Sequence, residues 1–339
     1  MSSKRSHQRS KLEEFQGTER FEILSRLGAG GMGVVYEAID HSSDTRVALK
    51  TLSLGDATSI YRFKKEFRGL SDISHPNLVT LYELLAGDEQ WFFTMELIRG
   101  RDLRTFLLDA RTVQDSIATE AITDESLQSE VEAPGNAIRV AKGNLELLRS
   151  ALAQLAEGLH ALHSAGRIHR DIKPSNVLVS EEHRVVLVDF GLSTKLAETD
   201  AISDRIAVGT VGYMSPEQAA QEPLGPASDW YSVGCVLYEL LTGQLPFTGR
   251  GDTVLIKKQD EDPVDVRELV PDLPTDLCDL CMALLRRDPA ARPAGADILK
   301  RLGASEDDRL FPLGAESSRG EVFVGRKLQL HLLQQALAS

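Results

Sequence analysis

The chain of 339 residues has few cysteines, few aromatic residues and no long apolar run. Three cysteines are too few for a disulfide-stapled secreted domain, and reduced thiols fit a cytoplasmic location. No run approaches the ~18 apolar residues that indicate a membrane span, so we predict none. The residues after Met1 are basic and polar rather than apolar, which argues against a signal peptide.

Basic residues are also fewer than acidic residues. The chain has 38 basic and 51 acidic residues, for a net charge of −13, which argues against nonspecific nucleic-acid binding. The basic start predicts a flexible, solvated tail over residues 1–20, with contact to an anionic surface as the alternative.

A single CxxC motif is formed by Cys278 and Cys281. It lies inside an apolar helical pattern, without a second cysteine pair or neighbouring histidines. We therefore expect buried helix residues, and zinc or redox chemistry is the alternative.

The hydrophobic pattern changes along the chain from strand-like to helical. Strands are predicted at 21–27, 34–40, 46–52, 78–84 and 91–95, with one helix at 61–73. Longer helices are predicted at 144–165, 228–242, 275–286 and 294–302. A small β-rich lobe followed by a large helical lobe is the expected layout.

The most informative stretch is His169–Asn176, followed by Asp189-Phe190-Gly191. Strand-like segments surround these strings and hold Asp171, Asn176 and Asp189 at fixed offsets. Such a hairpin can direct two side-chain oxygens at a divalent metal and a third carboxylate at a substrate hydroxyl. Phosphoryl transfer needs little more, because its catalysis is mostly positioning and charge neutralisation.

A glycine-rich string precedes that stretch. Residues 27–36 read as GxGxxGxV between two strand-like runs. Gly28, Gly30 and Gly33 let the backbone approach phosphates and donate N–H groups to them. The strand–turn–strand context disfavours a dinucleotide-binding fold, which needs strand–turn–helix.

In this order and spacing, the strings make the chain resemble the eukaryotic-type protein kinases, specifically the bacterial serine/threonine branch. The resemblance implies an α+β, bilobal protein-kinase fold over 21–302, with a β-rich N-lobe at 21–97 and a helical C-lobe at 98–302. Compared with the family, residues about 109–142 look inserted. We interpret them as a mobile surface loop, and a docking element is the alternative.

The resemblance also implies the catalytic roles. Asp171 would accept or orient the proton of the substrate hydroxyl, and Lys173 would neutralise charge on the γ-phosphoryl group. Asn176 and Asp189 would ligate Mg²⁺ through oxygen atoms.

The implied ATP site draws on the first lobe. Lys50 should bond the α- and β-phosphates, and the helix carboxylate Glu66 should hold it in place. Backbone groups of Glu96 and Ile98 should bond the adenine. The expected ATP-binding residues are Leu27, Gly28, Ala29, Gly30, Gly31, Met32, Gly33, Val35, Ala48, Lys50, Met95, Glu96, Ile98 and Leu178.

Other family positions are expected to be structural. Glu217 should pair with Arg292, and Asp229 should hold the backbone of the catalytic loop. His169 should pack against Phe190 between the lobes and is not expected to act as a base.

Residues 303–339 lie past the expected end of the kinase domain. The run Glu321–Arg326 and the Leu-rich stretch after it resemble the entry to AAA/STAND-type ATPase modules. Lys327 departs from that pattern, and the chain has no GxxxxGK[ST]. Either the chain is a fragment with a fused ATPase module, which we favour, or this is a capping helix.

The expected function is an ATP-dependent serine/threonine protein kinase that uses Mg²⁺, with Mn²⁺ as a possible substitute. Lys173 and Thr210 favour the serine/threonine class. The expected partners are ATP and a protein with Ser/Thr hydroxyls, including the chain itself. The alternatives are a pseudokinase, disfavoured by the intact Lys50 and Asp171, and a small-molecule kinase, disfavoured by the complete peptide-binding segment 209–217.

A switching hypothesis concerns Arg170, directly before the proposed base. An arginine there usually awaits a phosphate on the activation loop. In this chain Asp204 is predicted to occupy part of that pocket, while phosphate on Ser203 or Thr199 would add to it. The alternative is that Asp204 is a solvated loop carboxylate.

Overall fold

The computed structural model describes residues 15–30, 33–52, 57–87, 90–108, 139–189 and 211–303. Within these ranges the chain forms two compact units. The first comprises the described parts of 15–52 and 81–97, and the second those of 57–80 and 98–303. Most of the predicted tail (1–20), of the predicted insertion (109–142) and of segment 303–339 lies outside the described residues, namely 1–14, 109–138 and 304–339.

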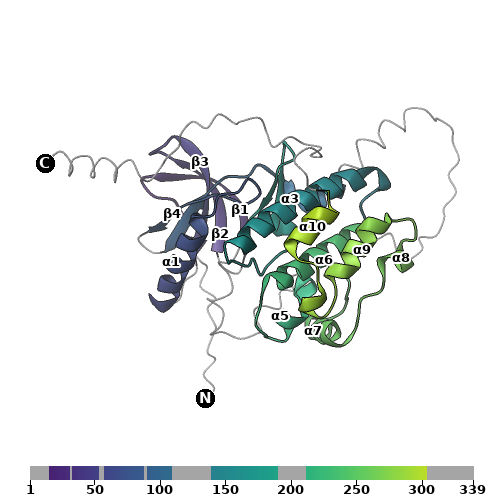
Figure 1. Ribbon diagram of the computed structural model, residues 1–339. Helices are drawn as coiled ribbons and strands as arrows, with labels where there is room; N and C mark the ends of the chain where they lie inside the picture. Colours follow the sequence, from purple (N-terminus) through teal and green to yellow (C-terminus); the bar gives the residue numbers. More distant parts are fainter. Residues whose placement is uncertain are drawn as a thin grey trace, which may run out of the picture. The chain divides into compact units, whose positions relative to one another are not determined.

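The first unit is an antiparallel sheet in the order β1-β2-β3-β5-β4, drawn in purple to blue in Figure 1. Its strands are β1 (Phe21–Gly30), β2 (Gly33–Asp40), β3 (Thr45–Leu52), β4 (Leu81–Ala86) and β5 (Trp91–Met95). Alternating apolar side chains of β2 and β3 build its core, because successive residues of a strand face opposite sides. The buried members are Phe21, Tyr36, Ala38, Val47, Leu49 and Phe92.

An aromatic residue ahead of the first strand joins this core. The ring centroid of Phe15 lies 5.3 Å from that of Phe92 and 6.2 Å from that of Tyr36. Offset aromatic pairs at such distances add stability beyond the area they bury. Within the predicted tail, Phe15 therefore packs on the sheet.

The fourth strand begins later than predicted. Leu78 belongs to the second unit, where it forms a single parallel bridge with Leu187, and the next N–H, of Val79, donates to the Leu187 carbonyl at 3.0 Å. These backbone groups are engaged elsewhere, so the prediction of a strand from 78 was wrong, and β4 starts at Leu81.

The second unit is mostly helical, with a small sheet in the order β6-β7-β8. Its helices are α1 (Ala57–Ser71), α3 (Leu145–Ser164), α5 (Pro216–Ala219), α6 (Pro226–Thr242), α7 (Gly251–Asp260), α8 (Val266–Leu269), α9 (Thr275–Leu284) and α10 (Gly295–Arg301). Its strands are β6 (Gly100–Asp102), β7 (Val177–Ser180) and β8 (Val185–Leu187). Strand β6 and helices α5, α7 and α8 were not predicted.

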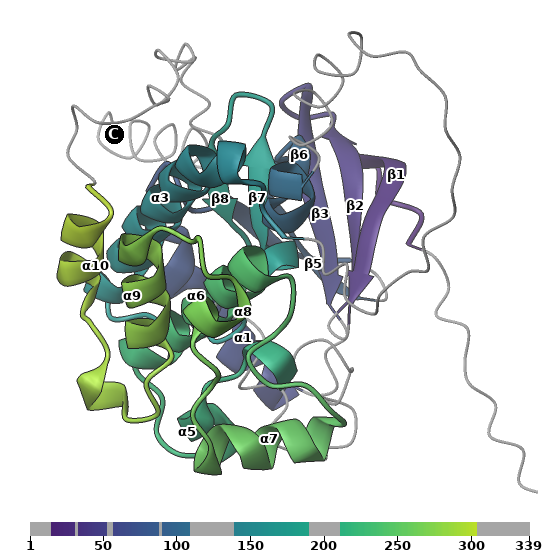
Figure 2. The same ribbon diagram turned by 90° about the vertical axis from the view of Figure 1, so that its right-hand side faces the viewer.

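Helix α6 forms the centre of this unit. It is apolar on nearly all sides, a pattern typical of a fully buried helix. Helix α9 packs on α6, and α10 packs on α3 and α9 (Figure 2). Cys278 and Cys281 lie buried in α9, as predicted.

Candidate active site

The catalytic loop runs from the end of α3 to β7 in the second unit. Asp171, Lys173 and Asn176 meet there. The Asp171 Oδ2 accepts hydrogen bonds from Lys173 Nζ at 2.8 Å and from Asn176 Nδ2 at 3.0 Å. Asn176 Nδ2 also donates to the Asp171 carbonyl at 2.8 Å. The carboxylate is therefore oriented by two donors, and about a quarter of its side chain stays exposed.

The carboxylate of Asp229 fixes the backbone of this loop through hydrogen bonds. This carboxylate, 1% exposed, accepts from the N–H of His169 and the N–H of Arg170, both at 2.7 Å. Arg170 has a φ of 72°, a left-handed conformation that a non-glycine residue keeps only when its surroundings impose it. The prediction for Asp229 is confirmed.

A third donor to the same carboxylate was not predicted. His163, in the last turn of α3, places Nε2 2.8 Å from Asp229 Oδ2, and its ring stacks edge-on with Trp230. In the sequence, His163 is recognisable only as a histidine at the end of an apolar helix. Histidine at that position ordinarily indicates a residue of the last helical turn and does not point to Asp229.

His169 is a structural residue, as predicted. Its side chain is fully buried, and Nδ1 accepts from the Asp171 N–H at 3.2 Å while Nε2 contacts the Val188 carbonyl at 3.0 Å. Burial lowers the pKa of His169 despite the nearby Asp229 carboxylate. A neutral ring with both nitrogens engaged cannot serve as a general base. Phe190, its predicted stacking partner, lies outside the described residues.

Asn176 and Asp189 are brought together by the β7–β8 hairpin. The Val188 N–H donates to the Asn176 carbonyl at 2.9 Å, so Asp189 directly follows the residue that is bonded to Asn176, just before β7. Asp189 has a φ of 61°, again left-handed for a non-glycine residue. Because the Asn176 amide nitrogen is committed to Asp171, its oxygen is the atom suited to a hard cation.

Four of the expected ATP-binding residues lie on one face of the sheet in the first unit. In the antiparallel register Val35 lies opposite Lys50, and Ala48 lies opposite Met95. Residues directly opposite one another share a face, and so do alternate residues of one strand. Val35, Ala48, Lys50 and Met95 are therefore on the same side of the sheet.

Within the glycine-rich hairpin the glycines differ. A Cβ on Gly33 would lie 1.7 Å from the Thr51 carbonyl oxygen, and its φ of 149° disfavours any side chain. A Cβ on Gly28 would meet nothing within 4 Å. The close approach of β3 is therefore enough by itself to require a glycine at position 33. Gly31 and Met32 lie outside the described residues.

The remaining expected residues are divided between the units. Leu27 and Glu96 belong to the first unit, while Glu66 on α1, Ile98 and Leu178 on β7 belong to the second. The pairing of Lys50 with Glu66 and the adenine contacts across the two units stay predictions.

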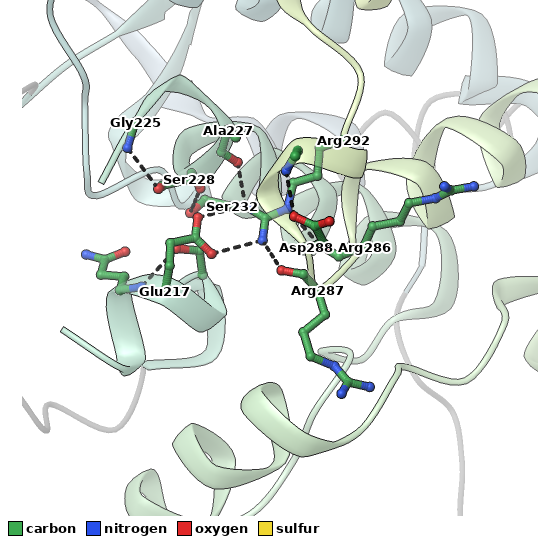
Figure 3. A network of polar contacts seen from close by, with 12 residues as sticks. Glu217, Gly225, Ala227, Ser228, Ser232, Arg286, Arg287, Asp288 and Arg292 are labelled. Carbon is green, nitrogen blue, oxygen red and sulfur yellow. Dashed lines mark hydrogen bonds and ion pairs between the residues drawn. The ribbon is translucent and has the colours of Figure 1, made fainter. Parts of the chain in front are cut away.

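A buried ion pair supports the segment after residue 210. Arg292 Nη1 and Nη2 donate to Glu217 Oε1 and Oε2 at 2.7 and 2.9 Å, as predicted (Figure 3). Carbonyls of residues 227, 286 and 287 accept the other N–H groups of Arg292. Gln218 lies next to Glu217 in α5, and its Nε2 donates to the Arg170 carbonyl at 3.0 Å. This bond connects α5 to the catalytic loop.

Comparison with known proteins gives a consistent result. Residues 21–302 match the family model "Protein kinase domain". Serine/threonine-protein kinase PknL of Mycobacterium tuberculosis is 32% identical over 292 residues, 85% of this chain and 66% of PknL. PrkC of Bacillus subtilis is 30% identical over 277 residues, 80% of this chain and 38% of PrkC. The chain thus spans just under two thirds, or less, of these relatives' length. The predicted fold class is confirmed.

Proposed function

Because the chain belongs to the protein kinase family, we propose that it transfers the γ-phosphate of ATP to Ser/Thr hydroxyls of proteins, including its own. The observation that carries this proposal is the Asp171 carboxylate held by Lys173 and Asn176 on a loop anchored by Asp229. The family implies ATP and a divalent metal, and PknL and PrkC are named serine/threonine-protein kinases.

In the proposed reaction Asp171 orients the substrate hydroxyl and accepts its proton as the oxygen–phosphorus bond forms. The bond between the γ-phosphorus and the bridging oxygen breaks, and ADP leaves. Lys173, 2.8 Å from Asp171, neutralises charge on the transferred group. Asn176 and Asp189 supply the oxygen ligands for Mg²⁺, which neutralises phosphate charge when bound, and we propose that Mn²⁺ can replace it.

Lys50 on β3 is proposed to bond the α- and β-phosphates, with Glu66 as its partner on α1. The hairpin around Gly28, Gly30 and Gly33 is proposed to cover the phosphates with backbone N–H groups. The adenine would lie on the apolar side chains that the register places on the Lys50 face.

Two further proposals concern location and partners. No helix among the described residues is long and apolar enough to cross a membrane. Three buried, unbridged cysteines support a cytoplasmic location. A fused or partner ATPase module beyond residue 303 is proposed from its sequence, and a GxxxxGK[ST] in coding sequence after Ser339 would test it.

The decisive experiment measures phosphate transfer from labelled Mg²⁺-ATP to the chain and to a basic protein. Asp171→Asn should lower turnover by about 10²–10⁴-fold, the contribution of a positioned base, while ATP binding persists. The exposed Asp260→Asn is the matched control. Undiminished transfer by Asp171→Asn would assign the activity to a contaminant, and ATP binding without transfer in the wild type would indicate a pseudokinase.

A further inference from the structure

Three successive backbone carbonyls before α5, those of residues 212–214, accept hydrogen bonds from side chains rather than from the backbone of a neighbouring strand. The carbonyls of Gly212 and Met214 accept from Lys258 Nζ at 2.8 and 2.7 Å. The carbonyl of Tyr213, between them, accepts from Ser232 Oγ at 2.8 Å. The donors come from α7 and α6, so two helices together fix the path of this segment.

Lys258 is unusual because its side chain is 1% exposed. Its ammonium lies 5.0 Å from the ring centroid of Tyr231 and 5.8 Å from that of Phe247, and Cys235 Sγ is 3.8 Å away. Burial lowers the pKa of Lys258, with the cysteine acting in the opposite direction. An ammonium is costly to bury, and the two carbonyls and the ring faces offset that cost.

Apolar contacts already hold α7 against this segment. Val211, Phe247 and Val254 form a buried cluster there, and a Cβ on Gly212 would lie 2.5 Å from Leu245 Cδ1. These apolar contacts do not involve the Lys258 ammonium and remain when it is replaced. The ammonium sets the direction of the two carbonyls, and its loss leaves both acceptors without that donor.

The segment is also connected to the catalytic loop. Directly after Met214, Ser215 Oγ accepts from the Gln218 N–H at 3.2 Å and starts α5. The side chain of Gln218 then donates to the Arg170 carbonyl, one residue before Asp171. The segment is thereby anchored beside the loop that carries the proposed base, whose backbone Asp229 fixes independently.

We infer that Lys258 is a positioning residue for the protein substrate. It holds the backbone of 212–214, part of the predicted peptide-binding segment, in the register that presents a substrate hydroxyl to Asp171. This inference rests on the proposed kinase function. It assigns Lys258 no contact with ATP, so it separates peptide recognition from nucleotide binding.

The test compares Lys258→Met with Lys257→Met, the adjacent lysine on α7, which makes no side-chain bond to the segment among the described residues. Steady-state kinetics are measured with a peptide that the wild type phosphorylates, together with ATP hydrolysis in the absence of peptide. Lys258→Met should lower kcat/KM for the peptide on the order of 10–100-fold, mainly through KM, as expected for misplaced substrate. The KM for ATP and the hydrolysis rate should change less than about twofold.

Ser232→Ala provides a second, smaller change, which guards against failure of Lys258→Met to fold. It removes the donor to the Tyr213 carbonyl, together with a longer bond to the Ser228 carbonyl within α6. It should shift the peptide KM in the same direction. Peptide kinetics equal to those of Lys257→Met, or an equal loss of peptide transfer and ATP hydrolysis, would overturn the inference. If the wild type phosphorylates no peptide or protein, the kinase function itself is overturned. That outcome differs from a loss confined to the variants.

Discussion

Glu217 and Arg292 form a bidentate ion pair from which solvent is excluded. The two side chains are 4% and 0% exposed, and every N–H of the guanidinium has an oxygen acceptor. The pair joins α5, next to the catalytic loop, to the turn before α10. A fully satisfied buried pair fixes geometry, and the loss of one partner leaves the other charge uncompensated.

Glu217→Gln should therefore be strongly destabilising. The neutral amide can accept from one N–H of Arg292 and turns an NH₂ group toward the other. We expect the free energy of unfolding to fall by about 3–5 kcal/mol, measured by urea denaturation at pH 7. The exposed Glu222→Gln should stay within about 0.5 kcal/mol of the wild type. Equal midpoints for the two variants would contradict a structural role for the pair.

The same pair predicts a loss of stability in acid. Burial by itself raises the pKa of Glu217, but the hydrogen bonds from Arg292 and Ser228 outweigh it and hold the pKa below its usual range. The carboxylate therefore stabilises the fold fully above its unfolded pKa of about 4.3, and this contribution is lost as the pH falls through the lower folded value. Urea midpoints from pH 6 to about pH 3 should decline more steeply for the wild type than for Glu217→Gln. Parallel declines would assign the acid sensitivity to other carboxylates.

Much of the fold could be predicted because its strands and long helices carry regular patterns. The alternation in β2 and the apolar run of α6 are local signals, and both elements lie where expected. Helix α7 was missed because Val254, Leu255 and Ile256 are consecutive rather than spaced as a stripe, and Ile256 is 60% exposed. Its burial depends on the segment it meets, which the local pattern does not contain.

The site residues likewise include some that the sequence predicted and some that it did not. Asp229 and the Glu217–Arg292 pair were predicted because they belong to recognisable strings at family spacing. Lys258 was missed because Lys257 and Lys258 are alike in sequence, and only contact with the 212–214 backbone distinguishes the buried one. The role of Gly33 was assigned to phosphates, whereas the Thr51 carbonyl already excludes a side chain there.

The predicted insertion should be dispensable for folding. Its flanks close on each other, since Asn144 Nδ2 donates to the Leu107 carbonyl at 3.1 Å. Val140 is buried and its N–H donates to the Leu240 carbonyl at 2.9 Å, so a deletion should spare it. Replacing 109–138 by about six Gly/Ser residues should change the free energy of unfolding by less than about 1 kcal/mol, because loop-closure entropy varies slowly with length.

The control is the longer deletion, 109–142, which also removes Val140 and should cost more stability. Thermal and urea unfolding of both variants measures the difference. Collapse of the fold in the shorter deletion would show that the segment packs into the core.

The last prediction concerns Asp204, which lies outside the described residues, and Arg170, whose backbone is fixed by Asp229 and Gln218. An arginine directly before the base can pair with an anion on the activation loop and so order it. If Asp204 supplies part of that charge, the unphosphorylated chain has basal activity, and phosphate on Ser203 or Thr199 raises it further. Asp204→Ala should then lower the turnover of phosphatase-treated protein severalfold, whereas Asp200→Ala, in the same segment, should not. Since a solvated carboxylate would leave the rate unchanged, equal turnover of Asp204→Ala and wild type would end the hypothesis.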